Sequence, residues 1–136
     1  MKAYTKRTWD VKFRHILSYP FIYSPVICFI LLDIVIELYH HICFPLYSIP
    51  KVDRSKYILI DRHHLSYINF VKKVWCVYCG YVNGLMPYWT EIIWRTEEYW
   101  CGIQHENDEI TRVQRHHKQF AAYGDAQDLK KKFSVW

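Results

Sequence analysis

ILSYPFIYSPVICFILLDIVIELYHHICFPLYSIP, residues 16–50, is the longest apolar stretch of this 136-residue chain. Only Asp33 and Glu37 carry a formal charge within it. A helix that begins near Pro25, where proline is tolerated in the first turn, and ends before Pro45 has about the length that crosses the apolar core of a bilayer. The stretch therefore predicts one N-terminal apolar helix that associates with a membrane.

The charged residues of this stretch are spaced to share one helix face. Asp33 and Glu37 lie four residues apart, and His40 follows three residues after Glu37. Helical side chains at these spacings are neighbours. Because an ionised carboxylate that faces lipid costs about 3 kcal/mol, we expect this polar stripe to face protein or water.

Three arrangements of residues 16–50 remain open. The stretch can be one spanning helix with its polar stripe turned inward, a monotopic or re-entrant segment, or a buried helix of a soluble core. Basic residues flank it on both sides, in MKAYTKRTWDVKFRH and in KVDRSK. Basic flanks tend to stay in the cytoplasm, which counts in favour of the second arrangement because both of its ends lie on one side.

Charge and composition also favour a membrane partner. The formal net charge is +5, and a basic arm ahead of an apolar stretch is typical of contact with anionic lipid. No nucleic-acid-binding module is visible, so no nucleic acid is expected as a partner. The 12 Tyr and 6 Trp suit lipid–water boundaries or packing against a larger membrane complex. The odd number of cysteines, 5, without a secretion signal indicates a reducing compartment rather than a disulfide framework.

We divide the chain into four segments. A basic N-terminal arm covers 1–15, the apolar membrane-associated segment 16–50, a helical Cys/His-containing domain 51–123 and a C-terminal tail 124–136. The last helix of the domain is expected over roughly 108–123, and the tail is expected to fray. These assignments predict a mainly α protein, a small helical bundle.

The Cys/His-containing domain is predicted to hold an antiparallel pair of helices. Asp61 can cap the first helix, whose apolar residues then recur at helical spacing. Asn83-Gly84 is the strongest turn signal in the chain. A second helix then begins near Thr90 and ends at Gly102. The pair is therefore expected to fold about the Asn-Gly turn.

Four residues of this domain form a candidate metal site. Cys76 and Cys79 stand three residues apart, and Cys101 and His105 stand four apart, so each pair fits one helical turn. Zinc takes thiolate and imidazole ligands in tetrahedral sites, and CxxC followed about twenty residues later by CxxxH is a familiar spacing. The two pairs meet only if the chain reverses between them, because a continuous helix would hold them about 30 Å apart.

Two other interpretations of these cysteines stay open. Cys76 and Cys79 can form a thiol–disulfide redox pair, although no thioredoxin-like pattern surrounds them. All of the cysteines can also be inert packing residues, because free cysteine is among the most buried residue types. Covalent haem attachment is disfavoured because Gly80 stands where the motif needs histidine.

Two further groups of residues are candidates for a catalytic site. Glu37 and His40 have the Glu-x-x-His spacing of four-helix di-iron proteins, but the chain lacks a second copy of it. Asp61 can orient His64 so that His64 acts as a general base. A helix-capping role of Asp61 explains the same residues without catalysis. The alternative to structural zinc is thus an iron-dependent, membrane-bound oxidoreductase that uses Asp33, Glu37, His40 and a later set of Glu and His residues, namely Glu91, Glu97, Glu98, His63 and His64.

Three motifs carry a family resemblance: DRHHL at 61–65, CVYCGYVNG at 76–84 and RTEEYWC at 95–101. Together with FAAYGDA further on, they resemble a family of small, functionally uncharacterised bacterial membrane-associated proteins. The similarity runs from about Asp33 to Asp125, and Gly102 stands where that family usually has proline. The resemblance implies a bacterial membrane location and no particular activity.

These observations lead to one expectation and two alternatives. We expect a membrane-associated protein at the cytoplasmic face of the bacterial inner membrane, in which Cys76, Cys79, Cys101 and His105 bind a metal, zinc before iron, in a structural or regulatory role. The first alternative is the iron-dependent oxidoreductase. The second is a metal-free accessory subunit that packs through its Trp and Tyr side chains against a larger membrane complex.

Overall fold

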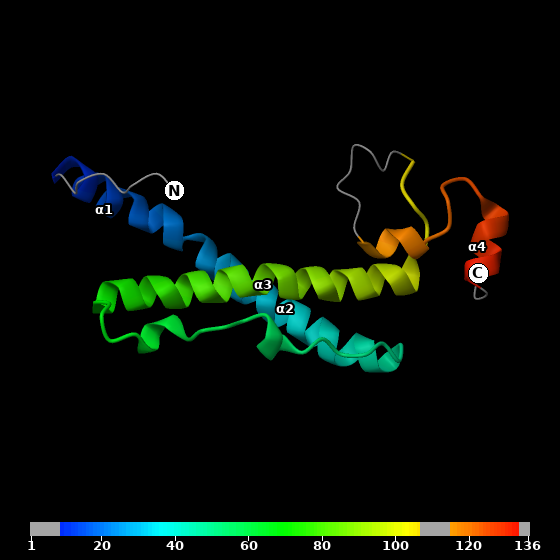
Figure 1. The fold of residues 1–136 in the computed structure, drawn as a ribbon, viewed down its shortest axis with the longest axis horizontal. Coiled ribbons are helices and arrows are strands. Elements are labelled where there is room, and N and C mark those ends of the chain that lie inside the picture. Colours follow the sequence, from blue (N-terminus) through cyan, green and yellow to red (C-terminus); the bar gives the residue numbers. More distant parts are fainter. Residues whose placement is uncertain (1–8, 107–114, 134–136) are drawn as a thin grey trace.

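The computed structural model describes residues 9–106 and 115–133, and helices dominate both ranges. The mainly α prediction is confirmed, and the described residues form no β-strand. Figure 1 shows the elements in chain order. The α-helices are α1 (Trp9–Tyr23), α2 (Pro25–Leu46), α3 (Phe70–Trp100) and α4 (Ala126–Lys132), and the short 3-10 helices are η1 (Arg54–Lys56), η2 (Arg62–His64) and η3 (Arg115–Gln119).

The N-terminal helices α1 and α2 follow one another almost without a break. Pro25 occupies the first turn of α2, as the sequence predicts, whereas Pro45 lies inside its last turn. The apolar run from Phe13 to Leu46 is 34 residues long, and by length and composition it could cross a membrane. Only 6% of its most apolar window is buried, so the third arrangement, a buried helix of a soluble core, is wrong.

The helix α3 runs straight through the predicted turn. Asn83-Gly84 and Pro87 all lie inside one helix of 31 residues, so the antiparallel pair about the Asn-Gly turn is wrong. Asn69, rather than Asp61, caps this helix, and its side chain accepts a hydrogen bond from the Lys72 amide at 3.0 Å. Asp61 instead precedes the short helix η2.

Close packing explains why a glycine stands at position 84. A methyl group on Gly84 would lie 2.7 Å from the Ile58 Cα and the Tyr57 carbonyl oxygen, and one on Gly80 would lie 2.9 Å from the Leu59 carbonyl oxygen. The two glycines therefore let the backbone at 57–60 press directly against α3. Glycine is therefore needed at positions 80 and 84 because another segment packs closely there, and not because the chain turns.

Helices α2 and α3 run in the same direction and cross, with the segment 47–69 returning alongside α3 (Figure 1). The order of contacts agrees with this, because Tyr23 touches Tyr78 and Tyr39 bonds to Thr96. The hydrophobic core lies where these three layers meet. Its buried members are Phe44, Val52, Leu85, Tyr88, Trp89 and Ile92.

The chain after α3 folds back as a separate small layer. Gly102, at φ +61°, follows the last turn of α3 and confirms the predicted helix stop. Ala121 then pairs with this stretch, accepting a hydrogen bond from the Gln104 amide at 2.9 Å and donating one to the Gly102 carbonyl at 2.7 Å.

Two predictions for the C-terminal part need correction. The helix expected over 108–123 lies partly outside the described residues, and its described part is the short η3 followed by the Ala121 pairing. The expected fraying tail contains α4 instead. Asp125 caps α4 by accepting hydrogen bonds from the amides of Gln127 at 3.0 Å and Asp128 at 2.9 Å.

Candidate metal centre

The four cysteine and histidine ligands predicted from the sequence do not come together. Cys79 and Cys101 are 22 residues apart along one continuous helix and its cap, which corresponds to about 33 Å. Cys76 and Cys79 are half-buried and Cys101 is exposed, and all three are free thiols. One ion therefore cannot bind both pairs, because the reversal that the site required is absent from α3.

A different cluster forms at the C-terminal end of α3. Glu97, in the last turn of α3, meets the histidine doublet of η3. The Nε2 atom of His116 lies 2.9 Å from one carboxylate oxygen of Glu97, and the Nε2 atom of His117 lies 3.1 Å from the other. One possible ligand atom from each residue falls within 4.8 Å of the others. We refer to Glu97, His116 and His117 as the Glu–His–His cluster.

The surrounding fold holds this cluster in place. The Gln104 side chain donates to the His117 carbonyl at 2.9 Å, and the Phe120 amide donates to the same carbonyl at 3.0 Å. The Phe120 ring stacks on His117, with ring centres 5.0 Å apart. Trp94 packs against His116 at 5.1 Å. The side chain of His117 is only 5% exposed, so the cluster is enclosed by protein on that side.

One ligand predicted from the sequence lies beside this cluster. The His105 ring is 5.6 Å from the His117 ring, centre to centre, and it is exposed. Cys101 is also near in the chain, but its thiol points to the Ile103 carbonyl at 3.9 Å. His105 is therefore the one member of the predicted set that the fold brings to the new cluster.

The electrostatics of the cluster favour an ionised glutamate. Burial acts to raise the pKa of Glu97, but hydrogen bonds from His116 and His117 outweigh it, and the net effect lowers this pKa. An anion in the last turn of a helix is disfavoured by the helix dipole. The histidines therefore compensate a charge that α3 alone would not stabilise.

The donor set fits a zinc ion, at some cost. Ligands about 2.0 Å from a tetrahedral zinc lie about 3.3 Å apart. The cluster places one ligand atom of each residue within 4.8 Å of the others, so the side chains would have to close around the ion. Binding through Nε2 moves each histidine proton to Nδ1, and those buried Nδ1 atoms have no hydrogen-bond partner among the described residues. A buried N–H without a hydrogen-bond acceptor lowers the stability of the fold by about 1–3 kcal/mol. Binding of a structural zinc ion contributes about 10 kcal/mol or more to the folding free energy, so the site remains favourable.

A second polar cluster occupies the stripe of α2. Arg54 donates to both carboxylate oxygens of Asp33, at 2.8 and 2.6 Å, and also bonds to Glu37. Tyr81 and Trp89 of α3 donate to Asp33, at 2.8 and 3.4 Å. The stripe therefore faces protein, as the sequence predicts. We call this set, with His40 and Tyr88, the Arg54 network.

Both ring nitrogens of His40 have hydrogen-bond partners at the Arg54 network. Its Nε2 atom accepts the Val52 amide at 2.9 Å, so the proton lies on Nδ1, which faces the Tyr88 hydroxyl at 3.2 Å. Tyr88 in turn donates to Glu37 at 2.9 Å. Glu37, His40 and His41 lie close enough to hold an ion. The Val52 amide already occupies Nε2 of His40, and Arg54 bonds to one carboxylate oxygen of Glu37 and to both of Asp33. An iron site based on Asp33, Glu37 and His40 would have to displace these hydrogen bonds.

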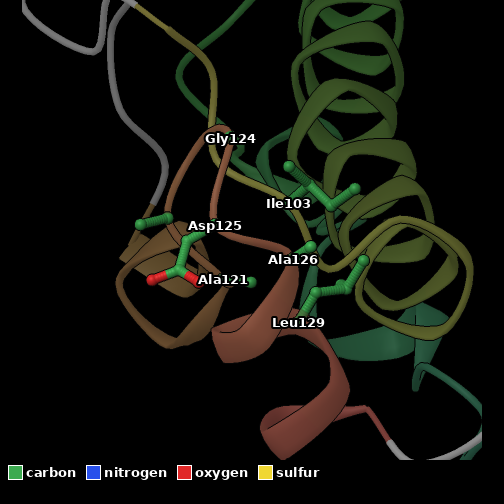
Figure 2. A pocket seen from close by; sticks show the side chains of 7 residues that line it. Ile103, Ala121, Gly124, Asp125, Ala126 and Leu129 are labelled. Atoms are coloured by element: carbon green, nitrogen blue, oxygen red, sulfur yellow. The ribbon is translucent and has the colours of Figure 1, made fainter.

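The remaining candidate residues make no catalytic pair. Asp61 and His64 are joined through a backbone hydrogen bond of 3.1 Å, while the His64 ring lies against His63 at 3.8 Å. Figure 2 shows a cavity between the stretch after α3, the loop before α4 and α4 itself. Its volume is about 210 Å³. Its lining is apolar except for Asp125, whose carboxylate already caps α4. Neither feature provides a reacting group.

Sequence reasoning missed the two histidines of this cluster and included Glu97 only in the di-iron alternative. His116 and His117 form a doublet with no regular spacing to Glu97, so the pattern does not pair them. Arg54 was noted only as part of a basic flank. The available signal was the histidine doublet near the end of the domain, which by itself does not name its partner.

Comparison of the chain with models of protein families finds no match, and neither the curated proteins nor the solved structures provide one.

Proposed function

We propose that this chain is a membrane-associated protein that binds one divalent metal ion, zinc before iron, at Glu97, His116 and His117. The observation that carries the proposal is the convergence of one carboxylate and two imidazoles, from separate elements, on ligand atoms within 4.8 Å of one another. Imidazole and carboxylate ligands both suit zinc. His105 is near enough to supply a further ligand after a change of side-chain conformation.

The role that fits this site is structural or regulatory. An ion there would join the last turn of α3 to η3, and with it the layer that carries Ala121 and α4. This supports a metal that holds the C-terminal layer on α3 rather than one that drives a reaction.

Several features support the location at the cytoplasmic face of a bacterial inner membrane. The apolar helix from Phe13 to Leu46 could enter a bilayer, and its basic flanks suit the cytoplasmic side. The free cysteines suit a reducing compartment. The resemblance carried by DRHHL, CVYCGYVNG and RTEEYWC agrees with a bacterial membrane protein.

Elemental analysis of the detergent-purified full chain tests the metal half of the proposal. We expect about one zinc per chain in the wild type, and loss of that zinc in Glu97→Gln and in His117→Gln. Cys79→Ser and Cys101→Ser are the matched controls and should keep it. Circular dichroism verifies that each variant retains its helices.

Each other result has a clear meaning. Zinc that is lost in both cysteine variants and kept in Glu97→Gln would overturn the assignment. Iron that is lost in Glu37→Gln would favour the oxidoreductase instead. A wild-type chain with no metal would leave the Glu–His–His cluster as a hydrogen-bonded brace and favour the accessory subunit of a larger membrane complex.

A further inference from the structure

The exposed apolar surface of the N-terminal helices is one-sided and long. Side chains on α2 that face away from the Arg54 network are exposed, from Ile27 at 66% to Ile42 at 58%. The same face continues onto α1. Its largest exposed members are Phe13, Leu17, Phe21, Ile27, Leu31, Val35, Leu38, Ile42 and Leu46. We call this set the apolar face.

The length of this face differs from what a perpendicular crossing needs. The apolar run has 34 residues, which corresponds to about 50 Å of helix, whereas the hydrocarbon core of a bilayer is about 30 Å thick. A perpendicular helix also meets lipid on all sides. Here one side of α2 is covered along its length by α3 and the return segment.

The covered side carries charges that a crossing would bring into lipid. The return segment packs against α2 through Arg54 on Asp33 and the Val52 amide on His40. Asp53 and Lys56 lie in the same segment, with side chains 52% and 75% exposed. If α2 crossed the bilayer, these charges would lie at its middle, where ionised side chains are strongly disfavoured.

Shifting the crossing towards α1 does not remove the problem. Tyr19 and Tyr23 of α1 both pack on Trp75 of α3, at 5.3 and 5.5 Å between ring centres. Lys72, one turn earlier on α3, is exposed and lines the cavity between α1 and α3. A crossing through α1 would therefore carry a lysine and the start of α3 into the hydrocarbon.

We propose that the chain lies in the plane of the membrane, with the apolar face of α1 and α2 immersed in one leaflet of an anionic bilayer and α3 with the return segment on the water side. The apolar face supplies the immersed surface, and exposed basic side chains on the neighbouring elements, Lys51 after α2 and Lys72 in α3, complement anionic lipid headgroups. The inference rests on the proposed membrane association and adds its geometry. Both ends of α1–α2 then lie on the same side.

In-plane helices of this type usually have a polar face of their own. In this chain the rest of the fold replaces that polar face, because α3 and the return segment cover the side of α2 that carries Asp33, Glu37 and His40. This explains how so apolar a helix can lie flat instead of crossing.

Polarised infrared spectroscopy of the wild-type chain in oriented bilayers of phosphatidylethanolamine and phosphatidylglycerol provides the first test. The dichroism of the amide I band reports the average tilt of the helix axes, to which α2 and α3, as the longest helices, contribute most. The in-plane arrangement predicts that the helix axes lie close to the membrane plane, and axes close to the membrane normal would overturn it. The measurement needs no substitution, so it does not depend on whether a variant folds.

A depth measurement supplies the second test. Single cysteines at Ile27, Leu31, Leu38 and Ile42, each carrying a fluorescent label in an otherwise cysteine-free chain, are quenched by lipids with nitroxides at shallow and deep positions. We expect one shallow depth for all four sites. A crossing helix, with the Asp33–Glu37 region at the bilayer centre, predicts deep labels at Leu31 and Leu38 and shallow labels at Ile27 and Ile42, with depth changing by about 1.5 Å per residue. This graded result would overturn the inference.

Sedimentation with the same vesicles separates the two proposals. If the chain does not bind vesicles, membrane association fails and the in-plane inference fails with it. If it binds but the depths are graded, only the in-plane arrangement fails and membrane association stands. A label at Lys56, expected on the water side, is the matched control and should escape quenching by both lipids.

Discussion

Arg54 holds the carboxylate of Asp33 through both of its terminal nitrogens, at 2.8 and 2.6 Å, and so joins the return segment to the middle of α2. The Asp33 side chain is 11% exposed and the Arg54 side chain 36%. Planar two-point pairing of this kind is specific to arginine. It allows two acidic residues to stand inside an otherwise apolar helix.

Arg54→Ala should destabilise the fold strongly. The substitution leaves two partly buried carboxylates, Asp33 and Glu37, without their cation, and we expect a loss of about 2–4 kcal/mol in the free energy of unfolding. Arg54→Lys keeps the charge but loses the paired geometry, so its loss should be intermediate. Denaturant titration followed by tryptophan fluorescence measures both.

Lys56→Ala is the control for that series, because Lys56 is exposed and pairs only loosely with Asp53, at 3.8 Å. It should change the free energy of unfolding by less than about 0.5 kcal/mol. Equal effects of Arg54→Ala and Lys56→Ala would contradict the structural role of the Arg54 network.

Gly84→Ala distinguishes a packing glycine from an ordinary helix glycine. At an open helical position alanine would stabilise by about 1 kcal/mol. Here its methyl group would lie 2.7 Å from backbone atoms of the segment 57–60, so we expect destabilisation by about 1–3 kcal/mol. Thermal unfolding followed by circular dichroism reports the sign, and an increase in melting temperature would refute the close contact.

Acid should weaken the cluster of the metal-stripped chain. The pKa of Glu97 is lowered in the folded state, where its hydrogen bonds from His116 and His117 outweigh burial. A lowered pKa contributes stability above the ordinary value, which is about 4.3 for glutamate, and that stability is lost as the pH falls through the folded pKa. Stability measured between pH 3 and pH 6 should show this loss in the wild type and much less of it in Glu97→Gln.

Metal removal should loosen the C-terminal layer without unfolding α3. Trypsin can cleave at Lys118 and within the lysine run of α4, and both sites lie beyond the proposed ion. We expect cleavage there to become about tenfold faster after chelation, because the layer opens more often. The His117→Gln chain should be cleaved fast with or without chelator, and unchanged cleavage in the wild type would argue against a bound ion that holds the layer.

Local pattern was enough to predict some of the fold. The apolar helix, its start at Pro25 and the helix stop at Gly102 all follow from short-range chemistry, because residues a few positions apart decide them. The inward direction of Asp33 and Glu37 also follows, since a carboxylate is too costly to leave in lipid. The choice of Arg54 as their partner could not be predicted in this way.

The sequence by itself determined the mainly helical class, the apolar helix and a polar stripe that had to be covered, whereas the structure showed that the apolar helix is exposed. Only the tertiary structure decided that Asn83-Gly84 stays helical, because Gly84 is needed for the backbone at 57–60 to approach α3. It also moved the candidate metal site from the cysteines to Glu97, His116 and His117. Contacts between residues nineteen or twenty positions apart follow no helical period, and they form only when the layers of the fold are packed together.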